Sequence, residues 1–215
     1  SAAKSSQRTL RNAEMLVVAT GMAILFAVSS VLAEDWPQFR GPNCTGVSRD
    51  SKNLPVKFST TEKVLWSVEL GEGIASPVIA HRRVFVTSMV DAQKFAVFCL
   101  DAATGREIWR QELDTGPLPD ITSPNTQASS TPVTDGERVY VYFSTLGLLA
   151  FDAASGKPLW EHPVATPFYL LGWGAAYSPI LYEDLVIFNQ DDDLSPMLLA
   201  LLGLAALAAY FGIPL

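Results

Sequence analysis

A repeated ten-residue segment constrains the fold of this chain more than any other feature of its sequence. Residues 100–109, LDAATGREIW, recur 51 residues later as residues 151–160, FDAASGKPLW. Three Ser/Thr-Pro pairs are each followed, seven residues after the proline, by a short β-branched run, and these runs are residues 84–86, 139–141 and 186–188. Self-similarity at such a period indicates one supersecondary unit that stacks on its neighbours.

Local residue preferences predict that each unit is built from strands. The runs are short, rich in Val, Ile, Phe and Tyr, and separated by clusters of Gly, Pro, Asp and Ser. Asp135-Gly136 lies between two such runs and is typical of a hairpin turn. In the segment 101–105, the Asp can cap its own backbone and the Gly can adopt a positive φ. Four short antiparallel strands in 40 to 50 residues would have the size of a propeller blade.

The repeated pattern Asp-x-x-Thr/Ser-Gly-x-x-x-Trp resembles the tryptophan-docking motif of the pyrroloquinoline quinone (PQQ)-like β-propeller family. The resemblance covers residues 35–201, and its opening segment 35–42, DWPQFRGP, is similar to the start of exported members. It implies that the Trp of one blade packs against the turn of the next, so that the motif residues have structural roles. These residues are Trp66, Asp101, Thr104, Gly105, Trp109, Asp152, Ser155, Gly156 and Trp160.

The third unit departs from this pattern. Leu202 stands where the motif requires an Asp, and neither Thr-Gly nor Trp follows it. We therefore expect an all-β, partial propeller of about two and a half four-stranded blades. Truncation, a changed reading frame near residue 202 and assembly with other chains each explain such an incomplete set, and truncation fits best.

Both ends of the chain are more apolar than the middle. Residues 1–33 combine a basic start, an uncharged run from Leu16 and an A-x-A-like end, which predicts a cleaved signal peptide or, if uncut, a membrane segment with a helical core. Residues 34–201 hold the repeats, and residues 202–215 form an apolar tail. Because Leu and Ala favour helix, residues 196–215 are a candidate transmembrane helix, the alternatives being a buried helix or a non-native end.

Charge and motif content narrow the ligands that the chain can bind. A net charge of −7 argues against nucleic acid as a partner. Asp191, Asp192 and Asp193 could contribute carboxylates to a Ca²⁺ site, but their position also fits a solvated hairpin loop. Trp173, flanked by glycines, could contact a cofactor or other ligand from a loop, whereas core packing is the ordinary role of such a residue.

The cysteines and histidines do not form the pattern of a disulfide framework or a zinc site. Cys99 lies on a predicted strand and reads as a small buried residue, and nothing supports a disulfide with Cys44. His81 and His162 are isolated from other metal-ligating residue types, so no zinc site is expected.

The resemblance leaves three functions open. The preferred one is an exported, periplasmic or extracellular, non-catalytic module that binds other proteins or further propeller blades, with one or both termini at a membrane and no cofactor. The second is a fragment of a PQQ-dependent dehydrogenase, which would use PQQ with Ca²⁺. The third is a membrane-anchored subunit of a larger complex. Enzymatic activity is left undecided, although the chain lacks the adjacent cysteine pair of many such dehydrogenases and shows no catalytic constellation.

Overall fold

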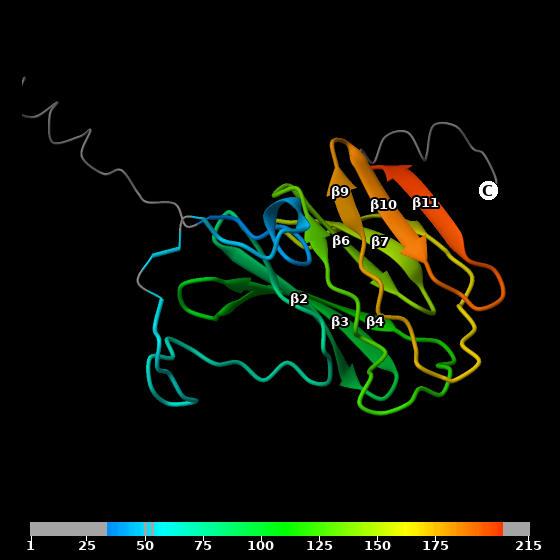
Figure 1. Cartoon of the computed structure of the whole chain (residues 1–215), viewed down its shortest axis with the longest axis horizontal. Coiled ribbons are helices and arrows are strands. Elements are labelled where there is room, and N and C mark those ends of the chain that lie inside the picture. The colour runs from blue at the N-terminus through cyan, green and yellow to red at the C-terminus, as the bar shows by residue number, and fades with distance from the viewer. Residues whose placement is uncertain (1–33, 50, 53, 204–215) are drawn as a thin grey trace, which may run out of the picture. The chain divides into compact units, whose positions relative to one another are not determined.

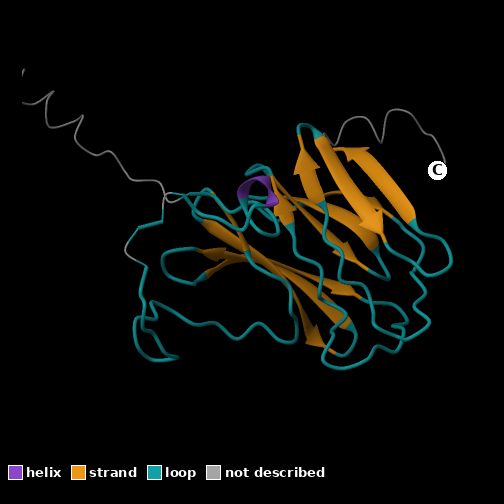
Figure 2. Cartoon of the chain, viewed as in Figure 1, coloured by secondary structure: helices purple, strands orange, loops and turns teal. Residues whose placement is uncertain are grey.

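The computed structural model describes residues 34–49, 51–52 and 54–203 of the chain, and this part is built almost entirely of strands and loops (Figures 1 and 2). After a short 3₁₀ turn, η1 (Pro42–Cys44), eleven strands follow among the described residues. They are β1 (Val78–Ala80), β2 (Arg83–Asp91), β3 (Lys94–Asp101), β4 (Glu107–Asp114), β5 (Val133–Thr134), β6 (Arg138–Phe143), β7 (Gly147–Asp152), β8 (Pro158–His162), β9 (Ile180–Tyr182), β10 (Leu185–Gln190) and β11 (Met197–Leu202).

The strands form three antiparallel sheets in chain order. The first sheet has the order β1-β2-β3-β4, the second β5-β6-β7-β8 and the third β9-β10-β11. Each begins just after one of the Ser/Thr-Pro pairs, and the β-branched runs of the repeat lie in β2, β6 and β10. The expected all-β architecture of partial propeller blades is therefore confirmed, with two complete four-stranded blades and a third of three described strands.

Apolar side chains between successive sheets form the core. Strand residues alternate between the two faces of a sheet, so each sheet presents one face to the sheet before it and one to the sheet after it. One cluster joins the first and second sheets and includes the stacked rings of Phe95 and Phe143, whose centroids lie 4.1 Å apart. Two further clusters join the second sheet to the third, around Tyr140 and Tyr142.

The structure contradicts the helix expected to begin near Pro196. Residues Met197–Leu202 form β11, which pairs with β10 over its whole length, with Leu199 opposite Phe188 and Ala200 opposite Ile187. The helix preference of Leu and Ala over β-formers is worth only a few tenths of a kcal/mol per residue. Backbone pairing along β10 and burial of alternate leucines against the second sheet outweigh that preference.

The other predictions for the two ends of the chain concern residues that the structure does not describe. The expected signal segment, residues 1–33, and the tail beyond Gly203 lie there. In the part that the structure describes, no helix combines the length and the apolar character needed to cross a bilayer.

The segment Asp35–Gln38 connects all three sheets. Trp36 exchanges backbone hydrogen bonds with Ile79 of β1, at 2.7 and 2.8 Å. The Pro37 carbonyl accepts from the N–H of Thr134 in β5, and the Gln38 side chain accepts from the N–H of Leu181 in β9. The first strand of every sheet thus binds the same four-residue segment.

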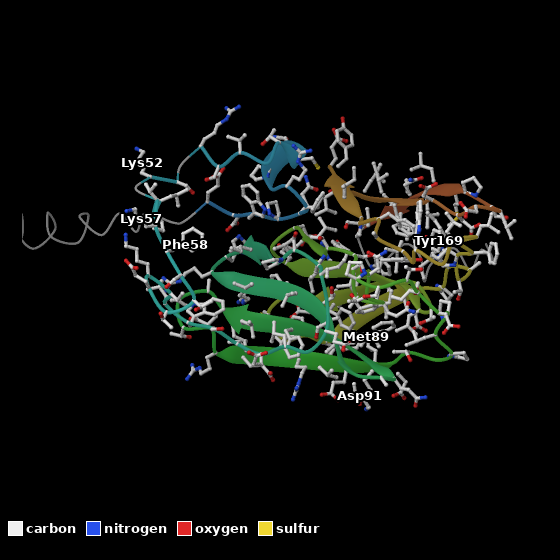
Figure 3. All side chains as sticks on the ribbon, turned by 60° about the horizontal axis from the view of Figure 1, so that its bottom comes forward. Lys52, Lys57, Phe58, Met89, Asp91 and Tyr169 are labelled. Carbon is white, nitrogen blue, oxygen red and sulfur yellow. The ribbon has the colours of Figure 1, made fainter. Side chains whose placement is uncertain are left out.

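A long segment outside the sheets precedes β1, and Glu72 near its end forms an isolated bridge with Met89 of β2. It includes Lys57 and Phe58, which are labelled in Figure 3. Several of its apolar side chains face solvent, and Leu65 is 90% exposed. The segment meets the first sheet at Trp66, which packs on the turn after β3.

Candidate functional site

At the junction between the first two sheets, the Trp of the repeated motif packs on the turn of the next sheet. Trp109 lies on β4, and its indole N–H donates a 3.1 Å hydrogen bond to the carbonyl of Ala153, in the turn after β7. Gly156, at φ 71°, lies against the same ring, where an added Cβ would come within 2.6 Å of it. Glycine is needed here both for its backbone conformation and for the close approach of the ring.

The turn that receives Trp109 is organised by one carboxylate. Asp152 Oδ1 accepts hydrogen bonds from the hydroxyl and the N–H of Ser155, at 2.6 and 2.7 Å. The hydroxyl bond contributes most to a pKa of Asp152 below its ordinary value, and the N–H bond adds to it. Such bonds stabilise the charged carboxylate, so Asp152 supports the turn in its ionised form.

The same arrangement recurs one sheet earlier. Trp66 donates to the carbonyl of Ala102 at 3.1 Å and packs on Gly105. Asp101 accepts hydrogen bonds from the hydroxyl and the N–H of Thr104, and the hydroxyl is the main cause of a lowered Asp101 pKa. These carboxylates thus hold turns, as their recurrence in the sequence suggests.

Trp160, on β8, lies in a different environment. Its indole N–H is buried and has no hydrogen-bond partner among the described residues. The backbone of the third sheet nevertheless follows the repeat, because Gly203 donates to Asp184 as Ala153 donates to Glu137. Leu202 occupies the position of Asp152, so the carboxylate that organises the other turns is absent from this one.

Residues 168–174, which we name the aromatic loop, expose a cluster of large apolar side chains between β8 and β9. Trp173 is 61% exposed and Leu170 76%, and Phe168 and Leu171 also face solvent. Trp173 therefore lies on the surface, in contrast to the ordinary expectation of core packing. Contiguous exposed apolar side chains of this kind are typical of interaction sites.

Hydrogen bonds hold the aromatic loop from one side through the acidic run. Asp192 Oδ2 accepts from the N–H of Phe168 at 3.0 Å, and Asp193 Oδ2 accepts from the N–H of Leu170 at 2.8 Å. Asp192 is only 8% exposed and also accepts from the N–H groups of Leu194 and Ser195. These backbone bonds, that of Ser195 first, lower the pKa of Asp192. The run lies in the hairpin loop between β10 and β11, where Asp191 and Asp193 are exposed and Asp192 is buried. Within this loop, Asp192 and Asp193 also hold the aromatic loop in place.

The loop after β4 holds the aromatic loop from the other side. Thr122 donates its N–H to the carbonyl of Gly172 at 2.7 Å and its hydroxyl to that of Leu171 at 3.2 Å. Asn125 donates its side-chain amide to the carbonyl of Trp173 at 2.7 Å. Backbone groups at both ends of the loop are thus satisfied, which orders the loop and leaves its apolar side chains outward.

A groove of about 650 Å³ adjoins the aromatic loop. Its walls include Tyr169 (labelled in Figure 3), Leu171, Trp173, Tyr177, Asp191 and Asp193. The Tyr169 hydroxyl donates to that of Tyr177 at 2.8 Å, and burial raises the pKa of both phenols. The groove therefore combines neutral aromatic surfaces with two carboxylates, a lining suited to a cationic group with apolar neighbours.

The acidic side chains of the described residues are dispersed or engaged in backbone hydrogen bonds. Among them, no group of three or more His, Cys, Asp or Glu side chains lies close enough to hold a metal ion. The Asp192 oxygens are engaged by backbone N–H groups, and Asp193 holds Leu170.

Neither Cys44 nor Cys99 forms a disulfide bond. Cys44 is exposed and Cys99 is buried, and both are free thiols. Burial raises the pKa of Cys99 to about 12, so this thiol is unreactive at neutral pH. His81 Nε2 lies 4.0 Å from a carboxylate oxygen of Asp35, beside the segment that connects the sheets.

The sequence did not predict a role for the apolar run Phe168–Leu171. The glycines and aromatic residues beside it are the sequence signal that could have indicated one.

Comparison with known proteins identifies the family. A family model described as "Outer membrane protein assembly factor BamB" matches residues 47–197, well over half of the chain. The chain belongs to this family of PQQ-repeat propellers. The match spans the first two sheets, β9 and β10 of the third and both complete docking motifs, so the resemblance inferred from the repeated Trp is confirmed.

Individual relatives include two alcohol dehydrogenases and a BamB protein. The quinohemoprotein alcohol dehydrogenase ADH IIB of Pseudomonas putida is 30% identical over 104 residues, which are 47% of this chain and 15% of that protein. The crystal structure of a quinohemoprotein alcohol dehydrogenase from Comamonas testosteroni covers 77% of this chain, at 20% identity and a TM-score of 0.45, and 24% of its own chain is matched. BamB from Moraxella catarrhalis covers 58%, at 18% identity and a TM-score of 0.39, with 33% of its chain matched. This chain thus spans a third or less of these relatives.

Proposed function

We propose that this chain is a non-catalytic binding module that holds a protein partner on the aromatic loop. One observation carries the proposal: the loop exposes Phe168, Leu170, Leu171 and Trp173 while its backbone is fixed by hydrogen bonds to Thr122, Asn125, Asp192 and Asp193. A rigid platform loses little conformational entropy when it binds, so its aromatic groups can contribute their full contact area. The family's description as an assembly factor agrees with this role.

The groove favours a partner segment with positive charge. Asp191 and Asp193 line it, and the whole chain carries a net charge of −7. An Arg side chain in the groove could lie over the Trp173 ring while its guanidinium faces a carboxylate, and a desolvated cation–π contact contributes up to about 2 kcal/mol. We therefore expect a basic, extended segment of a protein to bind here.

Export completes the proposed role. The basic and apolar residues 1–33 predict delivery across a membrane, which supports a role in the periplasm or outside the cell. We further propose that residues 1–33 or 204–215, which lie outside the described residues, associate with the membrane.

A peptide titration tests the binding role. The probe is a dye-labelled, unstructured peptide of alternating Gly and Arg, with a Gly-Glu peptide as its charge control, and fluorescence anisotropy reports binding. We expect the Arg peptide to bind and Trp173→Ala to weaken it about tenfold. Asp191→Asn should weaken it severalfold, whereas Glu62→Gln, which removes a charge outside the groove, should have little effect. Equal losses from Asp191→Asn and Glu62→Gln would show mere charge attraction and overturn the proposal.

A second candidate function follows from the enzyme relative. The 30% identity to a quinohemoprotein alcohol dehydrogenase over 104 residues favours a dehydrogenase fragment, in which PQQ and Ca²⁺ would be held partly by residues beyond those described. Adding PQQ and Ca²⁺ to the purified chain and following dye reduction by ethanol separates the two functions. Saturable activity would favour the enzyme, and none is expected from the binding module.

A further inference from the structure

A small pocket lies where the aromatic loop meets the loop after β4. Its volume is about 150 Å³. Its apolar walls come from Pro119 and Ile121 of the loop after β4 and from Pro167, Phe168 and Ala175 in and beside the aromatic loop. Apolar cavities of about this volume bind a single benzene ring. The pocket therefore has the size of one aromatic side chain.

The polar side chains of the pocket are paired with other wall residues. The hydroxyl of Ser144, which is only 4% exposed, donates to the side-chain carbonyl of Gln127 at 3.4 Å. The side-chain amide of Gln127 donates to the carbonyl of Pro119 at 2.6 Å. Because these bonds run between wall residues, an apolar ring can enter the pocket without breaking them.

Contacts between the two loops fix the shape of the pocket. Gly174, at φ 79°, lies against Ile121, since an added Cβ would come within 2.9 Å of the Cγ2 atom of Ile121. Thr122 donates both its N–H and its hydroxyl to carbonyls of the aromatic loop, and Asp192 holds the N–H of Phe168. A pocket with walls held in this way loses little conformational entropy when it binds a side chain.

The pocket and the groove share a wall. Tyr169, labelled in Figure 3, and Gly174 line both, so the two cavities are adjacent. Asp120 lines the pocket, whereas Asp191 and Asp193 line the groove. A positively charged segment that crosses the aromatic loop would therefore meet a carboxylate at both cavities. In an extended segment, alternate side chains point to one face about 7 Å apart, so one segment can fill two adjacent cavities.

We propose that this pocket is a second anchor site, which takes an aromatic side chain of the same basic segment that the groove binds. The inference rests on the proposed function and adds to it a second recognised residue of the partner. An aromatic side chain fits the pocket in size. It can also pair with the ring of Phe168, which is 48% exposed in the wall, and such pairs contribute beyond the area that they bury.

Two peptides test the second anchor. Both are the Gly-Arg peptide with its central Gly replaced, by Phe in one and by Ser in the other, and fluorescence anisotropy measures each affinity. We expect the Phe peptide to bind about tenfold more tightly, because burial of one aromatic side chain contributes at least this factor. Equal affinities would overturn the second anchor and leave the proposed function intact. Absence of binding by every Arg peptide would refute the proposed function, and the second anchor with it.

Variants of the pocket assign the gain in affinity to it. Ala175→Leu fills the pocket and should lower the affinity for the Phe peptide to that for the Ser peptide. Ala103→Leu adds the same atoms to the exposed turn after β3 and should keep the tenfold ratio. Ile121→Ala removes one wall and should lower the ratio severalfold, which keeps the test valid if circular dichroism shows that Ala175→Leu is unfolded. A ratio that survives in folded pocket variants would overturn the proposal.

A groove variant separates the two anchors. Trp173 lines the groove, whereas Phe168 lines the pocket. Trp173→Ala should therefore weaken the Phe and Ser peptides by the same factor, because the effects of independent sites add. Loss of the tenfold ratio in this variant would place the Phe ring on Trp173 and overturn the proposal.

Discussion

Trp109 and Trp160 occupy equivalent places on β4 and β8, yet only Trp109 has a complete docking site. Trp109 packs on Gly156 and donates to Ala153, whereas the buried N–H of Trp160 lacks an acceptor among the described residues. The carbonyl of Gly203, which corresponds to that of Ala153, accepts instead from the hydroxyl of Tyr140 at 3.2 Å.

The difference separates two contributions to the joining of blades. The apolar clusters between the sheets form at both junctions, around Phe143 at the first and Phe188 at the second. The docking turn forms in full only at the first. Packing of apolar faces is therefore enough to hold a sheet against its neighbour. The Asp-Thr/Ser-Gly turn adds a second contact at the end of the outer strand.

Replacing Trp109 or Trp160 with alanine should give the largest difference in the free energy of unfolding. Truncating a buried Trp to Ala costs about 3–5 kcal/mol, and we expect a loss of this size in the free energy of unfolding for Trp109→Ala. Trp160→Ala should cost clearly less, because Trp160 is only half-buried and makes no hydrogen bond through its indole. Urea unfolding of both variants measures the difference. Equal losses would mean that the docking turn adds nothing to packing.

A methyl group at Gly156 should break the same junction from the turn side. Gly156→Ala must place a Cβ within 2.6 Å of the Trp109 ring at φ 71°, and we expect a loss of about 3 kcal/mol. Gly116→Ala is the matched control, since Gly116 has φ 65° but no atom within 4 Å of its Cβ position. The control should lose only the backbone penalty of about 1–2 kcal/mol. A control that loses as much as Gly156→Ala would exclude the ring contact as the cause.

Phenylalanine substitutions isolate the indole hydrogen bond. Trp109→Phe leaves the Ala153 carbonyl without its donor, whereas Trp160→Phe removes an N–H that is already unsatisfied. Both variants lose similar ring volume, so Trp109→Phe should cost about 1–2 kcal/mol more than Trp160→Phe. Thermal unfolding of the two proteins supplies the comparison. The reverse order would contradict the assignment of the hydrogen bond.

The smallest expected effect is on the pH dependence of stability. The pKa of Asp152 is lowered in the folded protein, first by the Ser155 hydroxyl, so its contribution is present above the ordinary pKa of about 3.9 and is lost as the pH falls through the folded value. Asp152→Asn should therefore make Tm less dependent on pH in the acid range. Leu202→Asn, at the corresponding position of the third sheet, should leave that dependence unchanged. Calorimetry across acid pH provides the measurement.

The blades could be predicted because their evidence is local and repeated. The β-branched runs and the Asp-to-Trp spacing recur, and each occurrence supports the others. The helix expected from Pro196 was wrong because Leu and Ala were judged by propensity alone. In the sequence, Leu199-Ala200-Leu201 corresponds to Leu149-Ala150-Phe151 of the preceding repeat, which lies on the paired strand β7, and this correspondence predicts a strand.

The aromatic loop could not be predicted in the same way. Three consecutive aspartates look alike in sequence, and only the contact with Phe168 and Leu170 distinguishes Asp192 and Asp193 from their neighbour. The exposure of Trp173 likewise depends on Asn125, 48 residues away, which holds its backbone. Such tertiary contacts have no periodicity that a single sequence can show.

The segment that binds the first strand of each sheet has a consequence for the order of folding. Gln38 contacts Leu181, 143 residues away, so this bond closes after nearly the whole repeat array has been synthesised. Contacts of such separation slow folding because a long loop must be ordered before they form. The sheets can assemble early from local hairpins, while Asp35–Gln38 completes its contacts late. A chain shortened to begin after Gln38 should therefore fold faster and unfold faster than the full chain.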